Sequence, residues 1–132
     1  MLAEIKHRRS QVLSIHNVSR VDSFIQLGMS IRNKTTEEIR VAIDVSEPPV
    51  LIDEEKGTPL RMQSNPGIKL ASSQSSAEGF TPIPSNAVLH FSLQFASGEV
   101  KSGLFSFNLY LLIRGDQQVK KITAPLSVTL KG

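Results

Sequence analysis

Apolar and polar residues alternate with a period of two along much of the chain, which is the pattern of β-strands that bury one face. The clearest example is residues 24–32, where the inward positions are Ile25, Leu27, Met29 and Ile31. Residues 39–45 repeat the pattern with Ile39, Val41, Ile43 and Val45. Residues 33–38, with the sequence NKTTEE, are typical of a turn, so the two strands are predicted to form a hairpin.

Three further strands are predicted in the C-terminal half. Residues 88–95 place Leu89, Phe91, Leu93 and Phe95 inward and the polar residues between them outward. Residues 104–113 place Phe105, Phe107, Leu109, Leu111 and Ile113 on one face. Residues 119–130 end in a third alternating run, where Pro125 removes one ladder donor and therefore indicates an edge strand or a bulge.

The pattern is weaker elsewhere. Residues 12–21 are predicted to form a first strand that is less regular than the others, and the first ten residues form a helical turn at most. Residues 49–52 and 59–62 look like short strands. Residues 64–81 are rich in Ser and Gly, so they are predicted to form a long surface loop with one brief apolar segment at 68–70.

These elements predict an all-β fold, an immunoglobulin-like antiparallel β-sandwich of about seven to eight strands. A small closed barrel is the alternative. The chain of 132 residues fits one ordinary domain. We expect a basic N-terminal segment at residues 1–10 and a single sandwich domain at residues 11–132.

Four short motifs, in order, give the chain a family resemblance. They are "SIRNKT" at the end of a strand, the hairpin "LIDEEKGTPL", the loop "SNPGI" and the strand entry "FTPIPSNAVLHFSLQF". In this respect residues 24–112 resemble small immunoglobulin-like β-sandwich domains of bacterial exported and cell-envelope proteins. The chain departs from them at Pro84, Ser85 and Asn86, where such domains usually have a Pro-Gly turn. The resemblance implies a binding or spacer module, often extracytoplasmic, and brings no catalytic residues.

Composition narrows the chemistry. The chain has no Cys, which excludes disulfides, thiolate zinc sites and a cysteine nucleophile. Its longest apolar stretch, residues 109–113, is far shorter than a membrane helix, so no membrane span is expected. The N-terminus lacks the apolar core of a signal peptide. We therefore expect a periplasmic or cell-envelope location if a signal was removed before Met1, and a cytoplasmic one otherwise.

The acidic stretch "IDEEKGTP" at residues 52–59 suggests a cation site at first sight. A calcium loop of the EF-hand type that starts at Asp53 needs a glycine at its sixth position and a Glu at its twelfth. Thr58 and Ser64 occupy those positions, and Gly57 comes one residue early. The stretch therefore favours a hairpin turn in which Gly57 supplies a positive φ.

No other group of residues predicts catalysis or a cofactor. His16 and His90 fall on predicted strands, where they can meet across a sheet, but zinc or copper would need a third ligand. Adjacent carboxylates such as Glu37 and Glu38 lie on polar turns, where they stay hydrated. Nucleophile and phosphate-loop motifs are absent from the sequence. We expect no enzyme activity, no catalytic residues, no metal and no cofactor.

Two surface contacts are predicted. Tyr110 falls on the opposite face of its strand from the phenylalanines, so Tyr110, Leu112 and Phe80 are candidates for contact with a protein partner, against the alternative that they pack beneath a loop or strand. Lys6, Arg8 and Arg9 provide most of a short basic cluster that can meet an anion. Nucleic-acid binding is not expected, because the aromatic residues are mostly inward.

The leading functional hypothesis is a non-enzymatic interaction module in a bacterial envelope assembly. A partner protein would add a strand to an exposed edge, either at residues 126–130 or at residues 12–19. The alternative is a domain that binds a glycan or another small molecule through the 64–81 loop. Carbohydrate sites usually present aromatic platforms, and Phe80 is the single aromatic residue of that loop.

Overall fold

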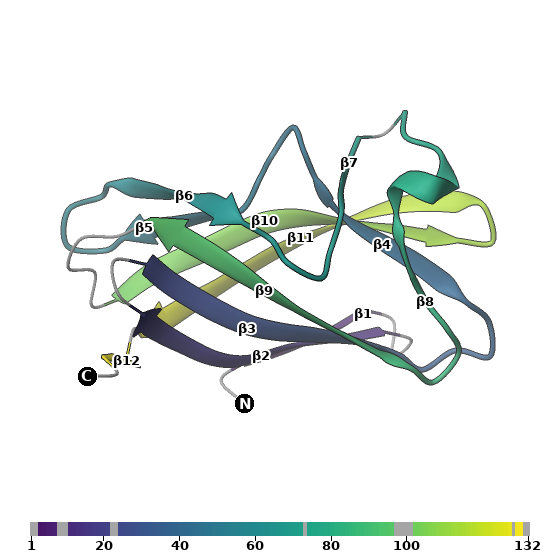
Figure 1. Cartoon of the computed structure of the whole chain (residues 1–132), viewed down its shortest axis with the longest axis horizontal. Helices are drawn as coiled ribbons and strands as arrows, with labels where there is room; N and C mark the ends of the chain where they lie inside the picture. The colour runs from purple at the N-terminus through teal and green to yellow at the C-terminus, as the bar shows by residue number, and fades with distance from the viewer. Residues whose placement is uncertain are drawn as a thin grey trace.

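The structure is a computed structural model that describes residues 3–7, 11–21, 24–72, 74–96, 102–127 and 129–130; for residues 3–7, 21, 125–127 and 129–130 it describes the backbone alone. The described chain forms twelve strands and one short 3-10 turn, η1 (Ala77–Gly79) (Figure 1). The strands are β1 (Ala3–His7), β2 (Gln11–Val21), β3 (Phe24–Asn33), β4 (Ile39–Asp44), β5 (Val50–Asp53), β6 (Pro59–Ser64), β7 (Leu70–Ala71), β8 (Thr81–Ile83), β9 (Val88–Ala96), β10 (Ser102–Ile113), β11 (Asp116–Ser127) and β12 (Thr129–Leu130).

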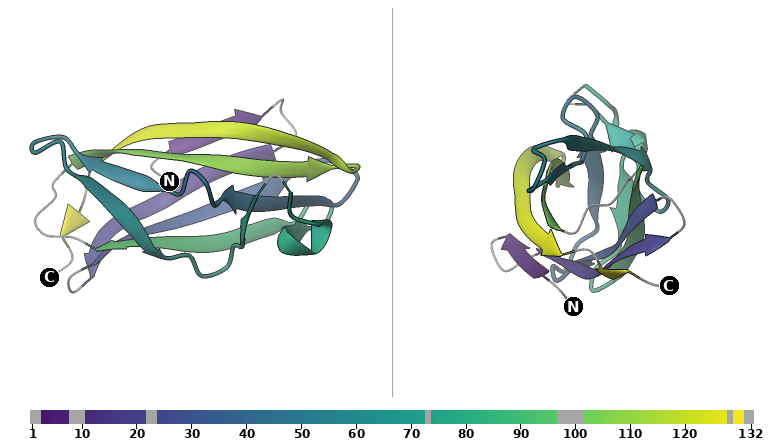
Figure 2. Two further views of the ribbon diagram at one scale, coloured as in Figure 1. Left: turned by 90° about the horizontal axis from the view of Figure 1, so that it is seen from above. Right: turned by 90° about the vertical axis from the view of Figure 1, so that its left-hand side faces the viewer.

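The strands form two sheets that pack face to face. Sheet 1 has the antiparallel order β2, β3, β9, β6, and β1 and β12 pair with the outer edge of β2. In sheet 2, β10 pairs with β11 on one side and with β4 and β5 on the other, and β7 and β8 extend β4. The β5–β6 hairpin joins the two sheets along one side. The end-on view in Figure 2 shows the strands surrounding one interior.

This architecture confirms the predicted all-β, immunoglobulin-like sandwich. All eight expected strands are present, as β2 to β6 and β9 to β11. The structure adds the short strands β1, β7, β8 and β12, which pattern alone does not identify because they have between two and five residues. The prediction of a helical turn in the first ten residues is wrong, since residues 3–7 pair with β2 as an antiparallel strand.

The predicted hairpin between β3 and β4 is also wrong. β3 is paired on both edges, with β2 on one side and β9 on the other, so it has no edge left for β4. β4 instead crosses to sheet 2 and pairs with β10 and β8. The alternation of apolar residues reports which face is buried, and it does not report which strand lies alongside.

Asn33 fixes the point where the chain crosses between the sheets. Its side chain is fully buried, and its amide nitrogen donates to the carbonyl oxygens of Glu37 and Ile83 at 2.7 and 3.0 Å. Its amide oxygen accepts from the backbone N–H and the hydroxyl of Thr35 at 2.9 and 2.6 Å. One buried amide therefore ties the β3–β4 crossing to the β8–β9 connection, with its polar groups satisfied.

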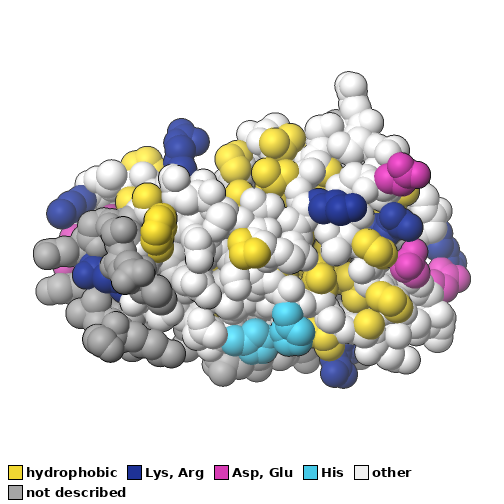
Figure 3. Space-filling model, viewed as in Figure 1, with side chains coloured by type: hydrophobic (Ala, Val, Ile, Leu, Met, Phe, Trp, Pro, Cys, Tyr) yellow, Lys and Arg dark blue, Asp and Glu magenta, His cyan; other side chains and the backbone are white. Residues whose placement is uncertain are grey.

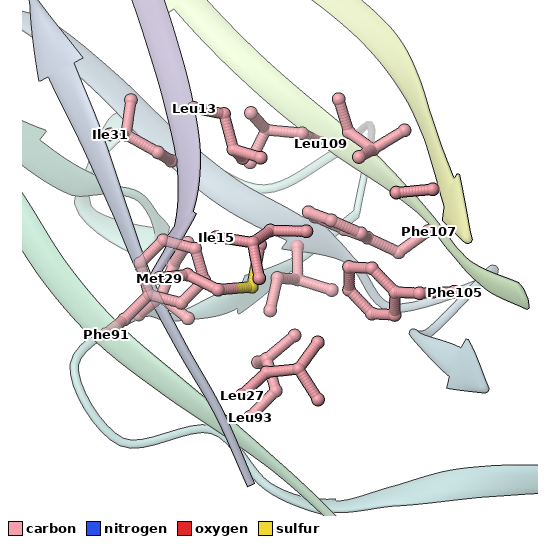
Figure 4. Close-up of a cluster of buried hydrophobic side chains, with 14 of the residues drawn as sticks. Leu13, Ile15, Leu27, Met29, Ile31, Phe91, Leu93, Phe105, Phe107 and Leu109 are labelled. Carbon is pink, nitrogen blue, oxygen red and sulfur yellow. The ribbon is translucent and has the colours of Figure 1, made fainter. Parts of the chain in front are cut away.

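The core lies between the two sheets. Sheet 1 contributes the inward rows of β2, β3 and β9, and sheet 2 contributes those of β4, β10 and β11 (Figure 4). Phe95 of β9 meets Phe105 of β10 edge to face, with ring centroids 6.1 Å apart, and Phe105 lies 5.3 Å from Phe107. The Phe95–Phe105 contact therefore joins the two sheets, and an edge-to-face pair of this kind adds about 1 kcal/mol beyond the burial of its area.

A β-bulge explains why the first strand is irregular in sequence. Ile15 and Val18 are both buried, although a regular strand would turn them to opposite faces. Ile15 pairs with Met29 and Asn17 pairs with Gly28, so His16 is an extra residue on β2. The bulge keeps both ends of β2 in phase with the core.

The segment between β6 and β8 is packed against sheet 2 and is not simply a surface loop. Phe80 lies 6.4 Å from Tyr110, and the two rings form a second small cluster with Ala42 and Ala71 on the outer face of sheet 2. The guanidinium of Arg40 donates to the carbonyl of Ala77 at 2.9 Å. The segment therefore covers part of this face.

Asp44 ends β4 beneath this segment, where it is buried. Val45, predicted to be inward, is 49% exposed because the strand ends one residue before it. Burial raises the pKa of Asp44, but hydrogen bonds from Ser46, Asn108 and Tyr110 outweigh burial and hold the pKa below its ordinary value of 3.8. Burial, followed by the nearby Asp44 carboxylate, raises the pKa of Tyr110.

Truncation of the central aromatic residue tests the inter-sheet packing. We expect Phe105→Ala to lower the free energy of unfolding by about 3–5 kcal/mol, because it removes a fully buried ring from a close-packed core. Leu104→Ala is the matched control on the same strand, since Leu104 is exposed, and it should change stability by no more than about 0.5 kcal/mol. Chemical denaturation measures both; similar losses would contradict this packing.

Acid sensitivity tests the Asp44 network. A folded-state pKa below the ordinary value means that the Asp44 carboxylate stabilises the fold above about pH 4, and that this contribution is lost as the pH falls through the folded-state pKa. We expect Asp44→Asn to lower the free energy of unfolding at pH 7 by about 1–2 kcal/mol. The difference from the native chain should shrink toward pH 2.5. A difference that does not change with pH would refute this role.

Candidate interaction site

The outer face of sheet 1 carries an ordered set of small, polar and basic residues and two valines. Residues that pair across antiparallel strands share a face, so the register of β2, β3 and β9 defines three rows. The rows are Val12, Arg32 and Val88; Ser14, Ser30 and His90; and Asn17, Gly28 and Ser92. All nine belong to the outward phase, opposite the core residues between them.

The bulge in β2 brings two histidines together on this face. His16, the extra residue, lies with its ring centroid 6.3 Å from that of His90, although the two strands are separated by β3. Nε2 of His16 is hydrogen-bonded to the hydroxyl of Ser30, which lies on β3 between them, at 2.7 Å. Figure 3 shows the two imidazoles side by side on the surface. Sequence predicts that these histidines can meet across a sheet, and the structure confirms it.

Two shallow hollows meet at this histidine pair. One, of about 560 Å³, lies over Asn17, Gly28 and Gly67, and the other, of about 440 Å³, lies over Ser14, Ser30 and Arg32. The side chain of Asn17 packs over Gly28, so a Cβ at this position would lie 2.8 Å from the amide nitrogen of Asn17. We call the two hollows together the histidine groove.

The charged side chains that line the histidine groove are basic. Arg32 and Lys34 are exposed and line its second hollow, and no Asp or Glu is among the described residues that line either hollow. Among the described residues, the ion pairs involve neither Arg32 nor Lys34. The nearest acid by register is Glu4, whose backbone in β1 pairs with Ser14. The groove therefore offers cationic groups without acidic partners in its lining.

The histidine pair does not amount to a metal centre in the described part of the chain. No group of three or more His, Cys, Asp or Glu side chains gathers there in an arrangement that could hold a metal ion. The groove can instead act through hydrogen bonds from imidazole and hydroxyl groups and through the charges of Arg32 and Lys34.

The predicted partner contact at Tyr110, Leu112 and Phe80 is not an exposed patch. The structure brings these residues together, but Tyr110 is 7% exposed and Phe80 is 1% exposed. Tyr110 points away from the main core, as its phase indicates, and residues far from it in sequence then cover it. These residues therefore pack beneath a loop, which is the alternative that the sequence left open, because the β6–β8 segment lies on this face of sheet 2.

The predicted anion contact falls largely outside the described residues. Arg8 and Arg9 lie beyond the parts of the chain that the structure describes, and only the backbone of Lys6 is placed. That backbone pairs with Val12, which lies in the same row as Arg32. The position of Lys6 is therefore next to the histidine groove, and its contact with an anion stays a prediction.

The acidic turn after β5 is a hairpin turn, as predicted. Gly57 has a φ of 66°, and its N–H donates to the carbonyl of Asp53 at 2.7 Å. A carboxylate oxygen of Asp53 accepts the backbone N–H of Glu55 at 2.9 Å, so this acid serves the turn. The 64–81 loop likewise buries Phe80, its one aromatic ring, which leaves it without the exposed platform that glycan binding favours.

The edges of the sheets differ from the sequence prediction. Residues 12–19 lie on β2, which is paired with β3 on one side and with β1 and β12 on the other, so β2 is not a free edge. Residues 126–130 are divided between the end of β11 and β12, which pairs with β2. The long edge strand among the described residues is β11, which pairs with β10 along its 12 residues and with no other described strand.

Comparison with known proteins supports the fold. The chain matches no protein-family profile, and no curated protein matches it. The GAE domain of yeast GGA1 superimposes with a TM-score of 0.59 at 14% identity, covering 96% of this chain and 99% of that one. AggA, the major subunit of aggregative adherence fimbriae type I from Escherichia coli, gives 0.49 at 11% identity, covering 90% and 93%. A PapD-like domain of human CEP192 gives 0.45 at 11%, covering 91% and 87%.

The likeness to the yeast domain defines the class to which this chain belongs by fold, the immunoglobulin-like β-sandwich domains. The match covers nearly the whole of both chains, so it includes both sheets. At this level of identity it concerns the fold alone. No helix in the described residues is long and apolar enough to cross a membrane.

Deletion of the bulge residue tests how His16 is positioned. Removal of His16 leaves Ile15 paired with Met29 and Asn17 paired with Gly28, so both ends of β2 keep their register. We expect the deletion to keep a cooperative fold and to cost no more than about 1–2 kcal/mol. Deletion of Ser14 is the control, because it shifts the phase of the residues before it and should cost more than about 3 kcal/mol. Equal losses in thermal or chemical unfolding would contradict the bulge.

Proposed function

We propose that this chain is a non-enzymatic interaction module that binds another protein by strand addition at β11. The observation that carries the proposal is the length of β11, which pairs with β10 and with no other strand that the structure describes. β11 spans Asp116–Ser127, its inner edge is hydrogen-bonded to β10, and its outer edge faces no described strand. Such an edge presents backbone N–H and C=O groups to which an extended partner segment can pair.

The side chains of β11 are compatible with a selective edge. Val119 is 56% exposed and offers an apolar contact near the start of the strand. Lys120 and Lys121 follow it, and charges of this kind discourage a sheet edge from pairing with a second copy of itself. A partner that supplies acidic residues beside its strand would meet no such barrier. The edge therefore favours a dedicated partner over self-association.

The cellular setting belongs to the proposal as well. The resemblance of residues 24–112 to exported and cell-envelope domains of bacteria supports a role in an envelope assembly, in the periplasm or on the cell surface. The residues that precede Met1 in the native gene product would test this location, because export to the periplasm or the cell surface predicts a signal peptide there.

Two neighbouring proline substitutions test strand addition. Successive N–H groups of a strand point to opposite sides, so one of Val119→Pro and Lys120→Pro removes a bond to β10 and the other removes an outward donor. The variant that loses a bond to β10 should have a free energy of unfolding about 1–3 kcal/mol lower than the native chain. The variant that loses an outward donor should keep its stability. It should fail to retain the partner that the native chain retains in affinity capture from cells of the source organism.

Val119→Thr is the matched control for this experiment, because it changes the side chain and keeps the backbone donor. We expect it to retain the partner. Capture that is undiminished in the stable proline variant would rule out strand addition at β11, whereas capture that is lost in the threonine variant as well would point to a side-chain contact.

A further inference from the structure

The histidine groove lies on a different surface from the β11 edge, and its charge suggests the chemistry of a ligand. Arg32 and Lys34 project from the end of β3, where the described ion pairs leave both without an acidic partner. His16 and His90 lie beside them, with Ser30 between the two histidines. The site therefore combines hydrogen-bond donors with positive charges, and a carboxylate can accept the hydrogen bonds and balance the charge.

The shape of the groove fits an extended chain. It follows β3 from Gly28 onward and reaches Lys34, the residue after the strand, which at about 3.3 Å per residue is a length of roughly 20 Å, or about six residues of extended peptide. The small side chains of Ser14 and Ser30, together with the backbone of Gly28, line it. A backbone can approach such a lining more closely than it could approach long side chains.

Apolar residues beside the charges favour a peptide over a nucleic acid. Val88, which is half-buried, lies beside Arg32 in the same row and lines the same hollow, and Val12 on the other side of Arg32 is buried. Nucleic-acid sites use a higher density of Lys and Arg, with exposed aromatic rings on which bases stack. The phenylalanine at this part of β9, Phe91, belongs to the core. Alternating acidic and apolar side chains of a peptide would match both kinds of group in the groove.

We propose that the histidine groove binds an acidic, extended segment of a partner protein, with its carboxylates placed against Arg32 and Lys34 and beside His16 and His90. This inference goes beyond strand addition at β11, because it concerns another sheet and a side-chain mode of recognition. The two surfaces would allow one module to contact two segments, or two partners, at the same time.

The test is an NMR titration of the full chain, labelled with ¹⁵N, at low ionic strength. The probe is an acetylated hexaglutamate amide, and the matched neutral probe is hexaglutamine. We expect hexaglutamate to cause saturable shifts of the amide signals of Ser14, Ser30 and Arg32, and hexaglutamine to cause none. Inorganic phosphate and a single-stranded hexathymidylate are the competing anions, and both should bind more weakly than hexaglutamate.

Charge reversal locates the binding. The double variant Arg32→Glu with Lys34→Glu should weaken hexaglutamate binding by at least about tenfold. The matched control reverses Lys56 and Arg61, two exposed residues on the β5–β6 hairpin, and makes the same change in net charge. We expect the control to bind as the native chain does. If the groove variant does not fold, Arg32→Gln with Lys34→Gln replaces it, and the spectrum itself reports folding.

Three results would overturn the inference. The first is the absence of saturable shifts, and the second is an equal loss of binding in the groove variant and the control, which would mean nonspecific attraction to a basic protein. The third is tighter binding of phosphate or hexathymidylate than of hexaglutamate, which would assign the groove to phosphate groups. The β11 proline variant that folds normally should bind hexaglutamate unchanged, so failure here is distinguishable from failure of strand addition.

Discussion

The structure depends on the packing of the inward side chains of sheet 1 against those of sheet 2, centred on Phe95 and Phe105. Because side chains alternate between the faces of a strand, this packing fixes the register of every strand that takes part. A slip of one residue would move a whole buried row into water. The bulge at His16 follows from the same constraint, since it allows Ile15 and Val18 of one strand to be buried together. The core therefore decides where the extra residue lies.

Once the inward rows are fixed, the outward rows are fixed too, and the two outer faces then differ. Part of the outer face of sheet 2 is covered by the segment that carries Phe80, which packs on Tyr110 above the buried carboxylate of Asp44. The outer face of sheet 1 carries serines, histidines and Arg32 at open hollows. Both proposed interaction surfaces, the histidine groove and the β11 edge, lie away from the covered face. Among the described residues, the fold thus leaves a polar outer face on sheet 1 and a long strand, β11, that is paired on one side.

Much of the fold could be predicted, because the burial phase of a strand is a local property. The inward residues of β3, β9 and β10 are those that alternation indicates. The neighbours of each strand could not be predicted in the same way. β4 lies beside β10 because both edges of β3 are already occupied, and Tyr110 is buried because a distant segment packs over it. For the candidate site, the sequence places His16 and His90 on strands, but the row of Ser14, Ser30 and His90 depends on a register that no single strand contains.

The sequence by itself determined an all-β chain, the face that each main strand buries and the turn at Gly57, because these depend on periods of two residues and on local backbone preferences. The tertiary structure alone decided which strands are neighbours, which outer face is covered and which of the described strands are paired on one side only. Those outcomes depend on competition between distant segments for the same hydrogen-bonding edges and the same apolar surface. The histidine groove is a product of that competition, since three strands must assemble in register before Arg32, His16 and His90 share one surface.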